Sequence, residues 1–282
     1  MSTSRIPALW LSLLAAVAGT CAAQEEATEV RQPFKIEPVL LDSENANNVS
    51  LGVSFDFAGS FGKAADDEED TDPDAINTDV VLRERAFDYA FRGTITQDGS
   101  DNPENFVEAE ISAKYLHSAS GRPTVKAGGF VEYEADQNLD DAQLVYGGTV
   151  TLAKLGVFGD NNYFALDANI GRVDPKGDVE REALLGPSLG AYTRADVEVL
   201  YSFNLGNASG GGFDAFEINY RYFREVSAAA AIEAAGLDRY KYAAYKLSFA
   251  NNLFVAYATG KLPFDRTSDQ IVKIGFSYNL KD

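Results

Sequence analysis

The sequence of 282 residues has one cysteine, one histidine and few basic residues. A single cysteine forms no disulfide within the chain, and a thiolate metal site needs several cysteines, so both are excluded. Lys and Arg total 24 against 43 Asp and Glu, which gives a net charge of −19. Because nucleic-acid binding requires a basic surface, this balance argues against a nucleic-acid partner.

The first 23 residues also lack the length of a membrane anchor. Arg5 precedes an apolar stretch from Ala8 to Ala18, and the small residues Cys21 and Ala23 follow. About a dozen apolar residues are too few to span a bilayer, whereas this order is typical of a secretory signal peptide. We therefore predict that 1–23 is a signal peptide and that the exported chain is free of cysteine.

The rest of the chain has no long apolar run but alternates between apolar and polar residues. In the segment IVKIGFSYNL, residues 271–280, Val272 and Ile274 point to one side of a strand while Lys273 points to the other. The pattern recurs through most of the sequence, as in 49–57, 87–95, 107–115, 125–133, 144–152, 164–170, 191–205, 216–222, 239–250 and 252–260. The chain is therefore predicted to be all-β.

Several of these runs are long for an ordinary sheet, whose strands average about five or six residues. Fourteen Tyr and 18 Phe accompany them. Strands of about ten residues, apolar on one face and rich in interfacial aromatics, are typical of a single sheet closed around a polar interior in a membrane. Lipid also requires every backbone group to be paired, which closure achieves. The apolar face is therefore predicted to meet lipid.

On these features the chain resembles the porin-like β-barrels of Gram-negative outer membranes. The resemblance covers most of the exported sequence, but the closing strand of that group ends on an aromatic residue and this one ends Leu280-Lys281-Asp282. It implies a cell outer-membrane location, contact with outer-membrane lipid and lipopolysaccharide, and delivery by the outer-membrane assembly machinery. It leaves the oligomeric state open.

The strand count follows from the turns. Counting a possible first strand at FKIEPVLL (34–41), we predict a transmembrane antiparallel up-and-down barrel of about 12 strands, with 10 to 14 as the range. Residues 24–48 are then a lead-in that can include this strand, and 49–282 form the barrel. The segment 227–236 breaks the strand period and is rich in alanine, which predicts a short helix in one loop.

The acidic segment 63–79 is the strongest local signal. Asp70, Asp72 and Asp74 alternate within it, and clustered carboxylates bind hard cations such as Ca²⁺ or Mg²⁺. The spacing begins like an EF-hand, but Ala75 replaces the required glycine and Val81 the bidentate glutamate. A weak metal site and a solvated acidic loop are the two interpretations, and no other cofactor is expected. Counting twelve strands places this loop with the short turns of the periplasmic side, whereas it would be extracellular if 34–41 were only a lead-in; the two sides stay open.

His117 is the only histidine and invites comparison with barrel hydrolases that pair a histidine with a serine two residues on. Position 119 is alanine, and Ser118 and Ser120 project to the opposite face. A Ser-His pair is thus not supported on this strand, and we expect no enzyme.

The charged residues of the polar face carry the functional prediction. By parity, the residues expected to line the barrel interior, or lumen, are Glu84, Asp88, Arg92, Glu108, Glu110, Lys114, Lys126, Glu132, Asp167, Arg194, Asp196, Glu198, Glu217, Arg221, Lys246 and Lys273. These charges either line a narrow diffusion channel with a mild cation preference, which we favour, or cross-link into a structural or surface-interaction barrel without transport. A lipid hydrolase and a soluble periplasmic binding protein are less favoured.

Overall fold

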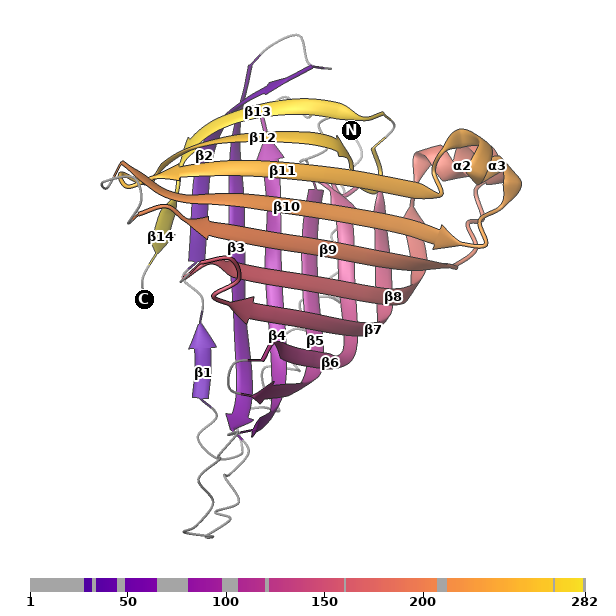
Figure 1. The fold of residues 1–282 in the computed structure, drawn as a ribbon. Coiled ribbons are helices and arrows are strands. Elements are labelled where there is room, and N and C mark those ends of the chain that lie inside the picture. The colour runs from indigo at the N-terminus through magenta and orange to yellow at the C-terminus, as the bar shows by residue number, and fades with distance from the viewer. Residues whose placement is uncertain are drawn as a thin grey trace.

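The chain folds into one closed antiparallel β-barrel, seen in the computed structural model of Figure 1. The structure describes residues 28–31, 34–44, 49–64, 81–97, 106–119, 122–159, 161–206, 212–265 and 267–280. The predicted signal peptide and its cleavage site lie outside these residues. In order along the chain, the strands of the wall are β2 (Phe34–Ser43), β3 (Ser50–Ala64), β4 (Val81–Thr96), β5 (Phe106–Ala119), β6 (Thr124–Asp136), β7 (Ala142–Leu155), β8 (Tyr163–Gly177), β9 (Tyr192–Asn204), β10 (Phe213–Val226), β11 (Arg239–Phe249), β12 (Leu253–Lys261) and β13 (Asp269–Phe276).

The barrel closes between its first and last strands. β2 pairs with β3 on one side and with β13 on the other, with Leu41 opposite both Ser50 and Lys273. Two short strands complete these edges, because β1 (Thr28–Arg31) pairs with β3, and β14 (Tyr278–Leu280) pairs with β2. The predicted twelve-strand barrel is confirmed, and the segment 34–41 does form its first strand.

The structure differs from the predicted strands in two details. The strand expected at 271–280 has a one-residue interruption at Ser277, but β13 and β14 keep the same register against β2, with Gly275 opposite Val39 and Tyr278 opposite Ile36. The Ser277 backbone N–H donates to the Asn252 carbonyl at 2.9 Å, which continues the register between β12 and β13. The lead-in also carries β1, which was not predicted.

Apolar side chains cover the outer face of the barrel. Phe57, Phe91, Val131, Tyr220 and Ile274 all project outward and are between 39% and 50% exposed. They come from β3, β4, β6, β10 and β13, so the apolar surface runs around the wall. A soluble barrel would place these residues inside, because burying apolar surface is the main driving force of folding in water. The alternation therefore has the orientation expected of strands that face lipid.

The inner face is divided into two halves of different chemistry. On β4–β9 most inward positions are polar or charged, as predicted. On β11, β12, β13 and β2 they are largely apolar, and Leu41, Tyr242, Phe254, Ala258 and Ile271 pack there into one buried cluster. The expectation of a polar interior all round is thus wrong for this second half.

The two walls of the barrel cross at a steep angle. Figure 1 shows β8–β12 running across the view in front of β3–β6, which rise behind them. The middle of the curved wall contains glycines where no side chain fits: a Cβ on Gly128 would lie 1.9 Å from the Ala113 carbonyl oxygen, and one on Gly147 2.0 Å from that of Ile170. Glycine thus permits the close backbone approach that this sharp bend requires.

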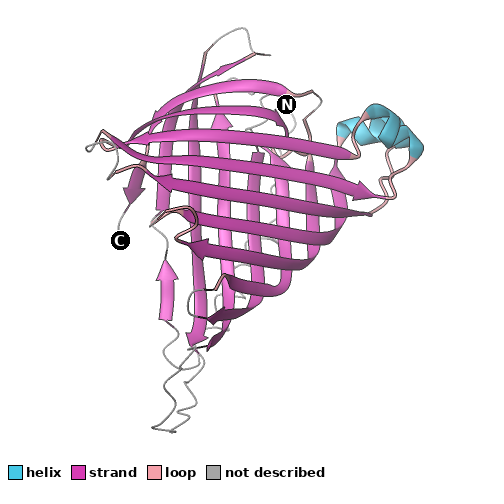
Figure 2. Ribbon diagram, viewed as in Figure 1, coloured by secondary structure: helices cyan, strands magenta, loops and turns pink. Residues whose placement is uncertain are grey.

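Two short helices lie together beyond one end of the barrel, coloured cyan in Figure 2. α3 (Ala230–Ala235) falls within the predicted segment 227–236 and ends on Gly236, which has the left-handed conformation (φ 68°). α2 (Val179–Leu185), in the loop between β8 and β9, was not predicted. None of the helices in the described residues is long and apolar enough to cross a membrane.

Arg181 of α2 connects these two helical loops. Its guanidinium, 3% exposed, contacts Glu225 on β10 at 2.5 Å and lies over the Tyr192 ring at 4.1 Å. Asp178 begins the helix by accepting a hydrogen bond from the Arg181 backbone N–H at 2.9 Å. Burial raises the pKa of the Asp178 carboxyl to about 6.

β3 ends and β4 begins at the end of the barrel opposite to the two helices, where β5, β7, β9 and β11 also end. The residues between them, 65–80, lie outside the described residues, so the side predicted for the acidic segment 63–79 stays a prediction. Asp70, Asp72 and Asp74 themselves lie outside the described residues, so the proposed metal site stays a prediction.

Candidate functional site

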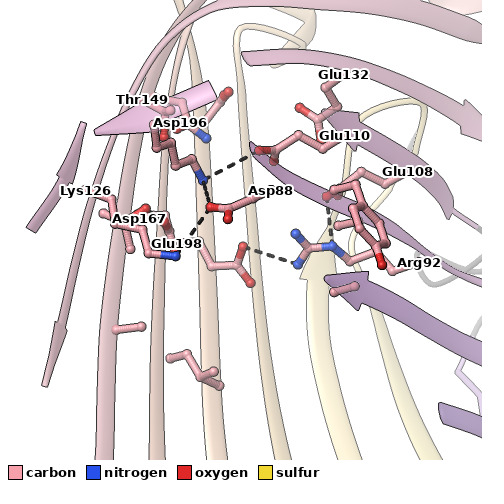
Figure 3. A pocket seen from close by; sticks show the side chains of 18 of the residues that line it. Asp88, Arg92, Glu108, Glu110, Lys126, Glu132, Thr149, Asp167, Asp196 and Glu198 are labelled. Carbon is pink, nitrogen blue, oxygen red and sulfur yellow. Dashed lines mark hydrogen bonds and ion pairs between the residues drawn. The ribbon is translucent and has the colours of Figure 1, made fainter. Parts of the chain in front are cut away.

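The charged half of the lumen contains a cavity of about 500 Å³. We call it the first cavity. Seven carboxylates and four basic side chains line it, and they come from both walls of the barrel. The acidic members are Asp88, Glu108, Glu110, Glu132, Asp167, Asp196 and Glu198, and the basic members are Arg92, Lys114, Lys126 and Arg221. Figure 3 shows most of these side chains converging on the same space.

Lysines from two adjacent strands hold the acids of β4 and β5. Lys114 lies 3.7 Å from both Asp88 and Glu110, and Lys126 lies 3.4 Å from Asp88. The second carboxylate oxygen of Asp88 has no hydrogen-bond partner among the described residues, and neither has the amide oxygen of Asn169, which also lines the cavity. Buried polar atoms in folded proteins are nearly always hydrogen-bonded, so these two atoms require water or a solute.

Four side chains form a bridge across the lumen. Glu108 on β5 contacts Arg92 on the neighbouring β4 at 2.9 Å and Arg221 on the opposite wall at 2.8 Å. Glu198 on β9 lies 3.8 Å from each of the two arginines, and its other oxygen accepts a hydrogen bond from Asn219 at 2.5 Å. The arginines are therefore held tightly by Glu108 and more loosely by Glu198. Figure 3 shows Arg92 between these two acids.

A second cavity of about 270 Å³ lies on the other side of this bridge. Its lining combines polar and apolar residues, and the apolar members Phe106, Tyr242, Ala244 and Leu262 belong to or adjoin the buried apolar cluster. Lys273 and Glu37 also line it, and Glu37 pairs with Lys246 at 2.5 Å. All four bridge residues line both cavities, so the bridge is their shared wall.

Another buried ion pair lies nearer the end that carries the helices. Arg194 on β9 contacts both carboxylate oxygens of Glu134 on β6, at 2.7 and 2.6 Å, and Asp196 at 2.7 Å. Gln143 donates a short hydrogen bond to Glu134 and accepts one from the Tyr192 hydroxyl at 3.2 Å. A buried arginine with this many partners is compensated for its lost hydration and stabilises one geometry of the wall.

The predicted lumen residues fall almost entirely on the inner face. Asp88, Arg92, Glu108, Glu110, Lys114, Lys126, Glu132, Asp167, Asp196, Glu198 and Arg221 line the first cavity, and Lys273 lines the second. Arg194 and Lys246 are in buried pairs, and Glu217 lies directly opposite Lys246 in the ladder. Glu84 is in β4, but its side chain is outside the described part of the structure.

Sequence reasoning missed some residues of the inner face. Glu134 was omitted because the strand was ended at Tyr133, whereas β6 continues to Asp136. Glu37 was omitted because residues 34–41 were treated only as a possible strand. Extending the alternation by one position past Tyr133 would have found Glu134, and applying parity to 34–41 would have found Glu37. Nothing in the sequence indicates which of the charges pair across the lumen.

Three carboxylates in the first cavity have the spacing to hold a metal ion. Glu108, Glu110 and Glu132 place one oxygen each within 4.8 Å of one another. Hard cations such as Ca²⁺ prefer such oxygen ligands. Glu108, however, is already bound by two guanidinium groups, which compensate its charge, so the cluster alone indicates an acidic region and not a metal centre.

His117 lies exposed near the end of β5, on the outer parity of that strand. The absence of an enzymatic function remains a prediction.

No protein-family model matches the chain, and neither does any curated protein. Solved barrel structures resemble it at 9–10% sequence identity. The NanC porin covers 87% of this chain over 100% of its own length with a TM-score of 0.46. An outer membrane channel from Pseudomonas putida F1 covers 91% of this chain and 97% of its own length, with a TM-score of 0.40. OpdK from Pseudomonas aeruginosa, solved with vanillate, covers 88% and 98%, with a TM-score of 0.39. Because these values are low, the function is argued from this chain's own residues.

Proposed function

We propose that this barrel lies in a bacterial outer membrane and forms a narrow diffusion channel for small polar solutes or ions. The apolar outer face supports the location, because exposed Phe, Tyr, Val and Ile side chains around a whole barrel are favourable only against lipid. The twelve-strand wall is compatible with a channel, since it is wider than eight-stranded barrels whose interiors are filled by side chains.

The observation that carries the proposal is the first cavity. A space of about 500 Å³ lined by charged side chains should hold water, because moving each charge out of water costs much free energy. The unpartnered oxygens of Asp88 and Asn169 add to this requirement. A hydrated, charged passage inside an apolar cylinder is what a small polar solute needs to cross a membrane.

We further propose a mild cation preference. Carboxylates outnumber basic groups seven to four in the lining of the first cavity. In a narrow space with low-dielectric walls this excess raises the local concentration of cations. The preference is mild, because Lys114, Lys126 and the two arginines compensate much of the acidic charge.

Single-channel recording of the refolded protein in planar bilayers tests both parts. We expect discrete conductance steps and, under a salt gradient, a reversal potential on the cation side. Glu110→Gln combined with Glu132→Gln should move that potential toward anions, more strongly at low salt, where screening is weaker. Glu233→Gln, on the exposed surface of α3, is the matched control and should leave it unchanged. A folded protein without conductance would contradict the channel, and anion selectivity in the wild type would contradict the charge argument.

A second candidate function is a structural or surface-interaction barrel without transport. Two observations favour it: the ion-paired bridge across the lumen and the apolar cluster that fills part of the other half. The same recordings separate the two functions, because a barrel whose lumen is blocked gives no conductance steps.

The expected partners stay predictions as well. The outer face fits lipid, whereas binding of lipopolysaccharide and of the assembly machinery, the absence of a nucleic-acid partner and the absence of a cofactor rest on the sequence alone.

A further inference from the structure

We propose that Arg92, Glu108, Glu198 and Arg221 form a partition that divides the lumen and, in the channel proposed above, sets the size of the solutes that pass. The partition is this group of four side chains. The size limit rests on the proposed function. The division of the lumen does not, because it is a property of the barrel whether or not the barrel conducts.

The first step is the position of the partition. Arg92 and Glu108 come from β4 and β5, whereas Glu198 and Arg221 come from β9 and β10 on the opposite wall. The 2.8 Å contact between Glu108 and Arg221 therefore crosses the whole lumen and does not join neighbouring strands. Two other inner-face pairs among the described residues, Arg194 with Glu134 and Lys246 with Glu37, join strands that are three positions apart around the wall, whereas β5 and β10 are five apart. Figure 1 shows β9 and β10 crossing in front of β4 and β5, and the Glu108–Arg221 contact shows that side chains of the two walls reach one another.

The second step is that the two cavities meet at the partition. Its four members line both the first and the second cavity. Without them, the spaces of about 500 and 270 Å³ would join into one passage. Twelve strands would allow a wider opening than either cavity provides, so the side chains and not the strand number limit the passage.

The third step concerns charge. The partition contains two acids and two bases and is neutral as a unit. Removing one acid and one base of the partition together should therefore widen the passage without changing the net charge of the lining. Size limit and ion selectivity are thus set by different residues, with selectivity left to the acids outside the partition such as Glu110, Glu132 and Asp167.

The fourth step identifies which acid of the partition is held less tightly by the arginines. Glu108 is 2% exposed in its side chain and binds both arginines within 2.9 Å, whereas Glu198 is 22% exposed and lies 3.8 Å from each. Contacts at 3.8 Å are beyond hydrogen-bonding distance and contribute less. The Arg92–Glu198 pair can be removed while Glu108 and Arg221 still neutralise each other.

The test compares the wild type with Arg92→Ala/Glu198→Ala in planar bilayers and in sugar-permeation assays with vesicles. We expect conductance to rise about twofold as the two cavities join, larger sugars to enter, and the reversal potential to change little. The control is Arg181→Ala/Glu225→Ala, which removes a buried arginine–glutamate pair that lines neither cavity and should leave conductance unchanged. Heat-dependent migration in gels verifies folding of each variant.

The outcomes separate the inference from the proposed function. A silent wild type with a conducting variant would refute the open channel and support the partition. A conducting wild type with an unchanged, folded variant would refute the partition and leave the channel standing. Silence in both would refute the partition as well. If the alanine variant does not fold, Arg92→Lys/Glu198→Asp retains the charges on shorter side chains and should raise conductance to a smaller extent; no rise would overturn the inference.

Discussion

The two halves of the lumen show that one alternating pattern can produce two different interiors. Outside, β4–β9 and the group of β11–β13 with β2 are equivalent, and both expose large apolar side chains. Inside, the first group carries paired charges around a cavity and the second carries packed Leu, Phe, Tyr and Ile. The outer face has to satisfy lipid everywhere, whereas each half of the inner face needs only to match the wall opposite.

The substitution expected to destabilise the charged half most is the removal of the Glu108 side chain. Glu108→Ala leaves two facing guanidinium groups without their closest acid, and an uncompensated buried charge typically costs about 3–5 kcal/mol. We expect urea unfolding in lipid vesicles to show a loss of this order. Glu110→Gln, on the next inward position of the same strand, is the control and should cost much less, because its partner Lys114 retains Asp88. Equal losses would show that the partition contributes no more to stability than the Glu110–Lys114 pair does.

The stability of the apolar half should depend on packing and not on charge. Leu41, which is 1% exposed, lies within the buried cluster, and Leu41→Ala should cost about 2–5 kcal/mol by leaving a cavity. The same unfolding assay measures it. Leu41→Met approximately conserves volume and should cost less than about 1.5 kcal/mol. If the alanine variant were as stable as the wild type, the cluster would be loosely packed.

The outer face should show no difference between the halves. Val131→Arg changes the outer face of the charged half, and Val272→Arg changes the outer face of the apolar half. Each places a charge among side chains exposed to the proposed lipid phase. The cost should reach about 2–4 kcal/mol if the position is near the bilayer midplane. Unfolding in vesicles again provides the measurement, with Val131→Ile and Val272→Ile as controls. Tolerance of both arginines would remove the main support for a membrane location.

The smallest expected effect lies outside the wall of the charged half, at Asp178 in the loop between β8 and β9. Its folded-state pKa, about 6, is above the ordinary value because of burial, so the folded state binds the proton more tightly than the unfolded state does. This contribution to stability is complete below the ordinary pKa and is lost as the pH rises through 6. We expect about 1 kcal/mol less stability from this group at pH 7 than at pH 5. Asp178→Asn retains the cap and should remove that part of the pH dependence.

Much of the wall could be predicted from the sequence, because period-two alternation determines which side chains share a face. The lumen list required only parity, and its members from Asp88 to Glu198, apart from Arg194, line the first cavity, whereas the side chain of Glu84 lies outside the described part of the structure. The apolar half was not foreseen, since Leu41 lies in the run Val39-Leu40-Leu41, which is apolar on both faces and gives no signal of orientation. The partition was not foreseen either, because contact between Glu108 and Arg221 depends on how the two walls cross, which no local pattern records.

Closure at β2 has a consequence for the order in which the barrel is assembled. Ser43 donates a hydrogen bond to Asp269 over a separation of 226 positions, and Lys246 reaches Glu37 over 209. Contacts so distant in the chain form only after the intervening strands have gathered, and such non-local pairing is slow. β2 must therefore wait as an unpaired edge until β13 arrives, and an unpaired edge is a template for pairing with other chains. The seam is where this molecule is most open to a folding helper and to misassembly, until the last strand arrives to close it.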